Sequence, residues 1–243
     1  MNKLIAFFRF VWSAILQLIY PRRCPFCDEP VLGKEEFVCA DCKVRIRVVK
    51  EPYCMKCGKE LNRSEAEYCA DCKKYPHKYD RGRSLLVYEG PVKRSVYRFK
   101  YAGRKEYAGS YAGLMEAELG DFVREISPDA LIPVPLHRKR FRKRGYNQAQ
   151  LLAKEIGGRM GIPVLGATVQ RVKNTVPLKT LERVRRQNNL KKAFKINGND
   201  VKLNTVIIID DIYTTGSTMD ALSAVLRRAG VKQIFFLTLA GGR

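Results

Sequence analysis

The stretch VIIIDDIYTTGST, residues 206–218, constrains the fold of this 243-residue chain more than any other. It opens with four consecutive β-branched residues, from Val206 to Ile209. Such a run is too apolar for a half-exposed strand, so it predicts a strand buried on both faces of a parallel sheet. Two carboxylates and a hydroxyl-rich turn follow, and an amphipathic helical pattern then runs to a stop at Gly230. The chain from residue 83 to residue 243 is therefore expected to form an α/β domain with a mostly parallel sheet.

The turn after this strand is a predicted binding site for a phosphate-bearing ligand. Ligands bind at the carboxyl ends of parallel strands, and a helix N-terminus offers free N–H groups to anions. Adjacent carboxylates would repel a lone phosphate, so the ligand needs hydroxyl groups beside its phosphate, as in ribose 5-phosphate. The carboxylates would bind the 2- and 3-hydroxyls, and the loop amides would bind the phosphate. The predicted residues are Asp210, Asp211, Thr214, Thr215, Gly216, Ser217 and Thr218. An ordinary strand, turn and helix without a ligand is the alternative.

Eight cysteines form a second pattern, which repeats with a period of thirty residues. Each repeat reads Cys-x-x-Cys, eleven residues, Cys-x-x-Cys, and the eight residues are Cys24, Cys27, Cys39, Cys42, Cys54, Cys57, Cys69 and Cys72. Two such knuckles supply the four sulfurs of a tetrahedral zinc site, so residues 21–75 are predicted to hold two structural Zn²⁺ ions. An iron–sulfur centre uses the same ligands and is the alternative. The spacing leaves open whether ligands pair within each repeat or between repeats.

The basic linker at residues 73–82 contains His77, which lies five residues beyond Cys72. Eight cysteines already complete two metal sites, so His77 is interpreted as a surface residue. Disulfides are not expected, because no secretory signal is recognised in the sequence.

The apolar stretch at residues 4–20 is interrupted by Arg9 and is marginal for a bilayer span of about 20 residues. Residues 1–20 are therefore expected to form an apolar helix. It either docks on the rest of the protein or lies on the inner face of the membrane. The protein is expected in the cytoplasm, with peripheral membrane contact as the second possibility.

A net charge of +22, from 46 Lys and Arg against 24 Asp and Glu, exceeds what solubility requires. It indicates a polyanionic partner, either nucleic acid or an anionic membrane surface, although a solvated basic surface is the plainer interpretation. Six of the eight residues from Arg138 to Gly145 are basic, and they follow the predicted strand ALIPVP. We expect a loop there that binds pyrophosphate through Arg138 and Arg144, together with Lys100. A nucleic-acid patch or a nuclear-type signal is the competing interpretation.

The stretch around Asp210 closely resembles the phosphoribosyl pyrophosphate (PRPP) motif of type I phosphoribosyltransferases, although Tyr213 is bulkier than the aliphatic residue usual there. The double Cys-x-x-Cys module, FKY at 99–101, IPVPLHRKRFRKRGYNQA and TTGST together resemble the ComF family of competence proteins over nearly the whole chain. The resemblance carries the Arg-Gly-aromatic-Asn-Gln signature onto residues 144–148. It also carries a Thr, Leu, Arg and Asn segment onto Thr175, Leu181, Arg186 and Asn189, with Leu178 where a Gln is usual.

The resemblance implies a zinc-ribbon module fused to a type I phosphoribosyltransferase-like domain, with Mg²⁺ accompanying PRPP. It also implies a role in natural transformation, in the uptake of single-stranded DNA, beside an ATP-driven DNA-translocating helicase. The absence of a G-x-x-x-x-G-K-[ST] loop agrees with a separate motor. Aromatic residues among the cations could stack on bases: Tyr97, Phe99, Tyr101, Phe141 and Tyr146.

Two alternative functions use the same residues. The first is an active phosphoribosyltransferase, in which an unidentified acceptor displaces magnesium-bound pyrophosphate from ribose C1. The second is a PRPP-sensing regulator of a DNA-processing partner, in which ligand binding changes the affinity for DNA or for the partner. The sequence assigns no catalytic residue and no acceptor site, and PRPP binding is favoured over turnover.

Overall fold

The computed structural model describes residues 21–31, 33, 36–61, 66–173, 193–197 and 203–242. A four-stranded sheet in the order β1-β6-β5-β2 lies at the centre of the C-terminal part, and all of its pairings are parallel. Its strands are β1 (Arg81–Val87), β2 (Ala130–Pro133), β5 (Thr205–Tyr213) and β6 (Gln233–Gly241). A separate antiparallel pair joins β3 (Val169–Arg171) and β4 (Phe194–Ile196). The predicted α/β fold with a parallel sheet is confirmed.

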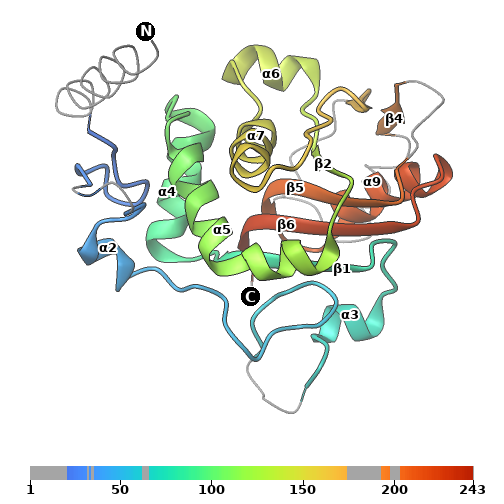
Figure 1. The fold of residues 1–243 in the computed structure, drawn as a ribbon, viewed down its shortest axis with the longest axis horizontal. Coiled ribbons are helices and arrows are strands. Elements are labelled where there is room, and N and C mark those ends of the chain that lie inside the picture. Colours follow the sequence, from blue (N-terminus) through green and yellow to red (C-terminus); the bar gives the residue numbers. More distant parts are fainter. Residues whose placement is uncertain are drawn as a thin grey trace, which may run out of the picture.

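Helices cover both faces of this sheet (Figure 1). One face carries α4 (Gly90–Tyr101), α5 (Tyr107–Ile126) and α7 (Gln148–Met160). The other face carries α9 (Ser217–Arg228). Three short helices, α2 (Ala40–Lys43), α3 (Ala70–Lys74) and α6 (Arg138–Arg144), lie outside these layers.

Strand β5 lies between β6 and β2 and is buried on both faces, as its sequence predicts. Val206, Ile207, Ile208 and Ile209 are each 0% exposed. Because side chains alternate along a strand, Ile207 and Ile209 join the core beneath α4, α5 and α7, whereas Val206 and Ile208 join the core beneath α9. This double burial fixes the strand in the sheet, so the carboxylates that follow Ile209 have a fixed position.

The first four-cysteine unit, defined by Cys24, Cys27, Cys39 and Cys42, packs on α4 and α5. Phe37 occupies the space above Gly113 of α5, where a β-carbon would lie 2.3 Å from its ring. Phe26 meets Tyr111 edge to face, with 6.1 Å between the ring centroids. This unit therefore adds its apolar side chains to the core of the α/β domain.

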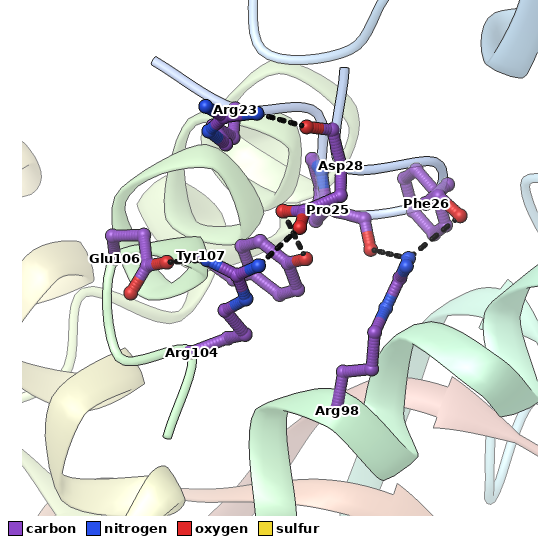
Figure 2. A network of polar contacts seen from close by, with 8 residues as sticks. All are labelled: Arg23, Pro25, Phe26, Asp28, Arg98, Arg104, Glu106 and Tyr107. Atoms are coloured by element: carbon purple, nitrogen blue, oxygen red, sulfur yellow. Dashed lines mark hydrogen bonds and ion pairs between the residues drawn. The ribbon is translucent and has the colours of Figure 1, made fainter. Parts of the chain in front are cut away.

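Polar contacts fix the same unit to the two helices (Figure 2). The guanidinium of Arg98 in α4 donates to the backbone carbonyls of Pro25 and Phe26, at 3.1 and 2.8 Å. Asp28 accepts a hydrogen bond from the Tyr107 hydroxyl at 2.8 Å and pairs with Arg104. These contacts hold the first knuckle against the last turn of α4 and the start of α5.

The chain then follows the outer edge of β1. The amide of Val49 donates to Leu85, and that of Val87 donates to Arg47, both at 2.9 Å. The segment therefore covers an edge strand whose backbone groups would otherwise be open to pairing. The second four-cysteine unit, defined by Cys54, Cys57, Cys69 and Cys72, adds Cys54 and Cys57 to the core on the α9 side.

Several expectations fall outside the described ranges. These are the apolar helix at residues 1–20, and the segment with Thr175, Leu178, Leu181, Arg186 and Asn189. Among the helices that the structure describes, none combines the length and apolar character needed to cross a membrane.

Candidate functional site

The eight cysteines converge in two groups of four, and each group comes from one repeat. Within each group all the sulfur atoms lie within 4.8 Å of one another. The Sγ atoms of Cys27 and Cys39 are 3.5 Å apart, and those of Cys57 and Cys69 are 3.7 Å apart. A tetrahedral zinc site with Zn–S bonds of about 2.3 Å requires sulfurs about 3.8 Å apart. The ligands therefore pair within each repeat, which the spacing alone left open.

The chemistry of these thiols also fits a bound cation. Burial raises the pKa of Cys42, and the neighbouring thiols of Cys27 and Cys39 raise it further. Four thiols so close together cannot all ionise unless a cation balances their charge. The structure thus supports the two predicted zinc sites.

The acidic pair lies at the carboxyl end of β5, where the sequence places it. Lys100 Nζ, from the last turn of α4, is 2.8 Å from Asp211 Oδ1, and both side chains are mostly buried. Two predicted site residues that are far apart in the sequence thus form an ion pair. Lys100 balances charge at a strand end that would otherwise hold two adjacent acids.

Asp210 has an environment different from that of its neighbour. Burial and the charge of Asp211 raise the pKa of Asp210 to about 7, although Lys100 and Arg171 act to lower it. Its Oδ1 accepts a hydrogen bond from the Asp211 amide at 2.8 Å. A carboxyl group with a pKa near 7, at the edge of a parallel sheet where ligands bind, is typical of a functional site.

The basic stretch after β2 is a helix, α6, so the predicted loop is wrong. The amide of Lys139 donates to His137 Nδ1 at 3.3 Å, which caps the start of the helix, and Gly145 ends it with φ of 79°. The helical period places Arg140 and Arg144 on one partly buried face. Arg138, a predicted pyrophosphate ligand, is exposed.

Arg140 and Arg171 are cations near the site that the sequence analysis did not single out. Burial lowers the pKa of Arg171 to about 10, with Arg140 lowering it further and Asp210 raising it. Burial also lowers the pKa of Arg140, as does the charge of Arg144. The spacing of residues 140 and 144 would have indicated Arg140 had a helix been expected, whereas no local pattern marks Arg171.

The turn that follows β5 joins it directly to α9. Gly216 has φ of 77°, in the left-handed region that favours glycine, and α9 begins at the next residue without a side-chain cap. The first amides of a helix have no intrahelical partner, so this turn can donate to an anion. A small depression here is lined by residues 212–219. The hydroxyls of Thr215 and Ser217 are hydrogen-bonded at 3.0 Å.

Tyr213, the unusual residue of this motif, lies in the core beneath the turn. It is 3% exposed and stacks on Phe236, with 4.9 Å between centroids and 3° between planes. Its hydroxyl is hydrogen-bonded to that of Tyr79 at 2.7 Å. The large ring is thus accommodated by the core on the α9 side.

The side chain of His77 is buried, so the interpretation of His77 as a surface residue is wrong. Its side chain is 0% exposed, and its Nδ1 lies 2.9 Å from Asp220 Oδ2 in the first turn of α9. Sequence distance hid this contact, since 143 residues separate the two partners.

The five aromatic residues proposed to stack on bases divide into two groups. Phe99 and Tyr146 are buried in the core, whereas Tyr97, Tyr101 and Phe141 are 62%, 59% and 46% exposed. The rings of Tyr97 and Tyr101, one turn apart on α4, have centroids 5.0 Å apart. Arg144 lies over the Tyr101 ring at 5.0 Å, so these aromatics adjoin the basic helix α6.

Comparison with known protein families gives two matches, one in each half of the chain. Residues 15–73 match the model of the double zinc ribbon domain. Residues 158–243 match the model of the phosphoribosyl transferase domain.

Relatives align along nearly the whole chain. Competence protein F of Haemophilus influenzae is 34% identical over 217 residues, which are 87% of this chain and 93% of that protein. The DNA utilization protein YhgH of Escherichia coli K12 is 27% identical over 220 residues, 89% of this chain and 96% of its own. Competence protein ComFC of Bacillus subtilis is 26% identical over 209 residues, 82% of each chain.

Proposed function

Because the chain belongs to the ComF family of competence proteins, with a double zinc ribbon and a phosphoribosyltransferase domain, we propose that it handles single-stranded DNA during natural transformation and binds Mg²⁺·PRPP. It would act at the cytoplasmic side of the uptake machinery, either free or in contact with the inner membrane face. An ATP-driven DNA-translocating helicase would supply the motion, since the sequence has no nucleotide-binding loop of the P-loop type.

The observation that carries the PRPP proposal is the set of complementary groups around the end of β5. Asp210 and Asp211 can accept hydrogen bonds from ribose hydroxyls, with Lys100 held 2.8 Å from Asp211. The uncapped start of α9 offers amides to the 5-phosphate. Arg140, Arg144 and Arg171 supply positive charge for pyrophosphate. These are the three kinds of group that one PRPP molecule requires.

In this arrangement the residues of the chain hold and orient the ligand. Mg²⁺ bound with PRPP would balance the charge of the pyrophosphate group. Partial burial of the acidic pair strengthens its hydrogen bonds to the sugar, because such bonds are stronger away from water.

The proposal for single-stranded DNA depends on the exposed aromatic rings beside cations. Tyr97, Tyr101 and Phe141 offer faces on which bases can stack, and each stacked base contributes about 1–3 kcal/mol. The basic helix α6 lies beside them, and the net charge of +22 favours a polyanion. Phosphate contacts would make the affinity fall steeply with salt.

The proposal is tested by titrating zinc-loaded protein with Mg²⁺·PRPP, and separately with a single-stranded oligonucleotide, for the wild type and Asp210→Asn/Asp211→Asn. We expect the double substitution to weaken PRPP binding at least about 10-fold, because it removes hydrogen bonds to charged groups. Oligonucleotide binding should be retained. Undiminished PRPP binding in the double variant would refute the site assignment. Oligonucleotide affinity that is the same at about 50 and 200 mM salt would refute phosphate contact.

A regulatory use of PRPP is favoured by one specific observation. Helix α4 carries both Lys100, which contacts Asp211, and Tyr101, which contacts Arg144. A ligand that displaces Lys100 would therefore act on the same helix that presents the aromatic rings. If PRPP regulates DNA binding, saturating Mg²⁺·PRPP must change oligonucleotide affinity, and the oligonucleotide must change PRPP affinity by the same factor.

Active turnover is the other candidate, and the near-neutral pKa of Asp210 favours it. An acceptor would displace pyrophosphate from ribose C1, and the electron pair of the breaking C–O bond would leave with pyrophosphate. Release of pyrophosphate from PRPP on adding candidate acceptors, abolished in Asp210→Asn/Asp211→Asn, would establish turnover.

A further inference from the structure

The segment that leaves the second four-cysteine unit contacts the turn assigned to phosphate binding. His77 Nδ1 donates to Asp220 Oδ2 at 2.9 Å, and the Lys78 amide donates to Asp220 Oδ1 at 2.9 Å. Asp220 belongs to the first turn of α9, and its own amide donates to Gly216 at 2.8 Å. Both carboxylate oxygens of a residue next to the turn are thus held by residues 77–78.

A second contact follows immediately along the same segment. The Tyr79 hydroxyl is hydrogen-bonded to the Tyr213 hydroxyl at 2.7 Å, and Tyr79 stacks on His77 with 4.7 Å between ring centroids. Tyr79 and Tyr213 both pack against Phe236 and share one core with Cys54 and Cys57. The aromatic side chains therefore connect the second four-cysteine unit with the residue that enters the turn.

The fit at Gly216 shows how closely these groups surround the turn. A β-carbon there would lie 2.8 Å from the Tyr213 hydroxyl and 2.9 Å from His77 Cε1. Gly216 is buried, and its backbone is in the left-handed region. The shape of the turn is thus limited by His77 and Tyr213 on its inner side, so movement of either changes the turn.

We propose that His77 and Tyr79 are positioning residues for the phosphate-binding turn, which couple metal in the second four-cysteine unit to ligand in the turn. This inference rests on the proposed PRPP site. Metal in the second unit fixes the start of the segment at Cys72, and His77 and Tyr79 transmit that order to Asp220 and Tyr213. Loss of metal frees the segment and loosens the turn.

The coupling must be reciprocal, because each ligand stabilises the arrangement that the other requires. Mg²⁺·PRPP should therefore slow the loss of zinc from the second unit. The first unit contacts Arg98 in α4 and Arg104 in the connection to α5, and among the described residues it has no such contact with the turn. It serves as an internal reference in the same molecule.

The test follows zinc release from the zinc-loaded full-length protein into a colorimetric chelator at constant Mg²⁺, with and without saturating PRPP. In the wild type we expect PRPP to slow release of one of two zinc equivalents by about tenfold, within the usual range for coupled sites. In His77→Ala this protection should disappear, and PRPP affinity should fall by a similar factor. His77→Asn, which keeps an N–H donor, should restore part of both effects. Lys73→Ala changes an exposed residue of the same unit and should behave as the wild type.

The possible results separate the two proposals. If the wild type does not bind Mg²⁺·PRPP, the proposed function fails. If it binds, the coupling is refuted when PRPP protects neither zinc equivalent or both equally, or when His77→Ala keeps wild-type affinity and protection. If His77→Ala does not retain two zinc equivalents without PRPP, the same two measurements are made on Tyr79→Phe, which removes one hydroxyl group and keeps the ring. Unchanged PRPP affinity and protection in Tyr79→Phe would then count against the proposal.

Discussion

At Asp210 the stability of the fold and the proposed binding of ribose make opposite demands, because the fold favours the protonated carboxyl and the ligand site uses the carboxylate. Its carboxyl is adjacent to Asp211 at the end of a buried strand, and its pKa is raised to about 7. The folded protein therefore holds a proton on Asp210 more tightly than the unfolded chain does. Ionisation of Asp210 therefore lowers the free energy of unfolding. The stabilisation that the protonated carboxyl provides is fully present below its pKa in the unfolded chain, and it is lost as the pH rises toward 7.

Asp210→Asn should consequently stabilise the protein at pH 8 more than at pH 5. A neutral amide removes the cost of a buried charge. The free energy of unfolding at pH 8 should therefore rise by an amount on the order of 2 kcal/mol. Denaturant unfolding of the wild type and Asp210→Asn at the two pH values measures this difference. Equal differences at pH 5 and pH 8 would show that Asp210 does not titrate in this range.

Single residues also show where sequence reasoning fails. Asp211 and Lys100 were both predicted as site residues, the one for ribose and the other for pyrophosphate, and they meet as an ion pair. The basic stretch from Arg138 is predicted as a loop, and in a loop no helical period distinguishes Arg140 from Arg138. His77 was misplaced because its partner Asp220 lies 143 residues away, and no local pattern indicates such a contact.

Helix α6 converts a run of cations into two faces with different roles. Arg140 and Arg144 share the partly buried face, and Arg138 and Arg142 share the exposed one. We expect Arg140→Ala to weaken Mg²⁺·PRPP binding about 10-fold through loss of charge-assisted hydrogen bonds, measured by calorimetric titration. Arg142→Ala is the matched control and should change the affinity for Mg²⁺·PRPP by less than about twofold, because its side chain lies on the exposed face. Equal losses in the two variants would indicate a general electrostatic effect.

Helix α4 presents the exposed aromatic pair. Tyr97→Ala should weaken oligonucleotide binding by about 1–3 kcal/mol through loss of stacking, followed by fluorescence anisotropy. Tyr68→Ala removes an equivalent ring, 41% exposed, from the second four-cysteine unit and should leave the affinity unchanged. Should Tyr97→Ala and Tyr68→Ala behave alike, the assignment of α4 to the DNA surface would be wrong.

Across the molecule as a whole, each four-cysteine unit belongs to one of the two cores that flank the central sheet. The first contributes Cys24 and Phe26 to the core under α4 and α5, and the second contributes Cys54 and Cys57 to the core under α9. Chelation of zinc should therefore lower the unfolding temperature of the entire protein in a single transition, as seen by calorimetry. A C-terminal part that melts unchanged after zinc removal would contradict this integration.

The sequence predicted the sheet well because its strands carry local signals. Val206 to Ile209 indicate a strand buried on both faces, and the repeated Cys-x-x-Cys pairs indicate two metal sites. The docking of the zinc units could not be predicted in this way. It depends on contacts such as Phe37 against Gly113 and Tyr79 against Tyr213, whose partners are far apart in the sequence and have no shared pattern.

The central claim is that the end of β5 forms a cradle for a whole PRPP molecule. It is tested most directly by comparing the affinities of zinc-loaded protein for PRPP, ribose 5-phosphate and pyrophosphate, each with Mg²⁺. The account predicts that PRPP binds more than about 10-fold more tightly than either part, because acids, turn and cations each hold a different portion of it. Pyrophosphate that binds as tightly as PRPP, with no detectable ribose 5-phosphate binding, would contradict the account and leave only a basic anion patch.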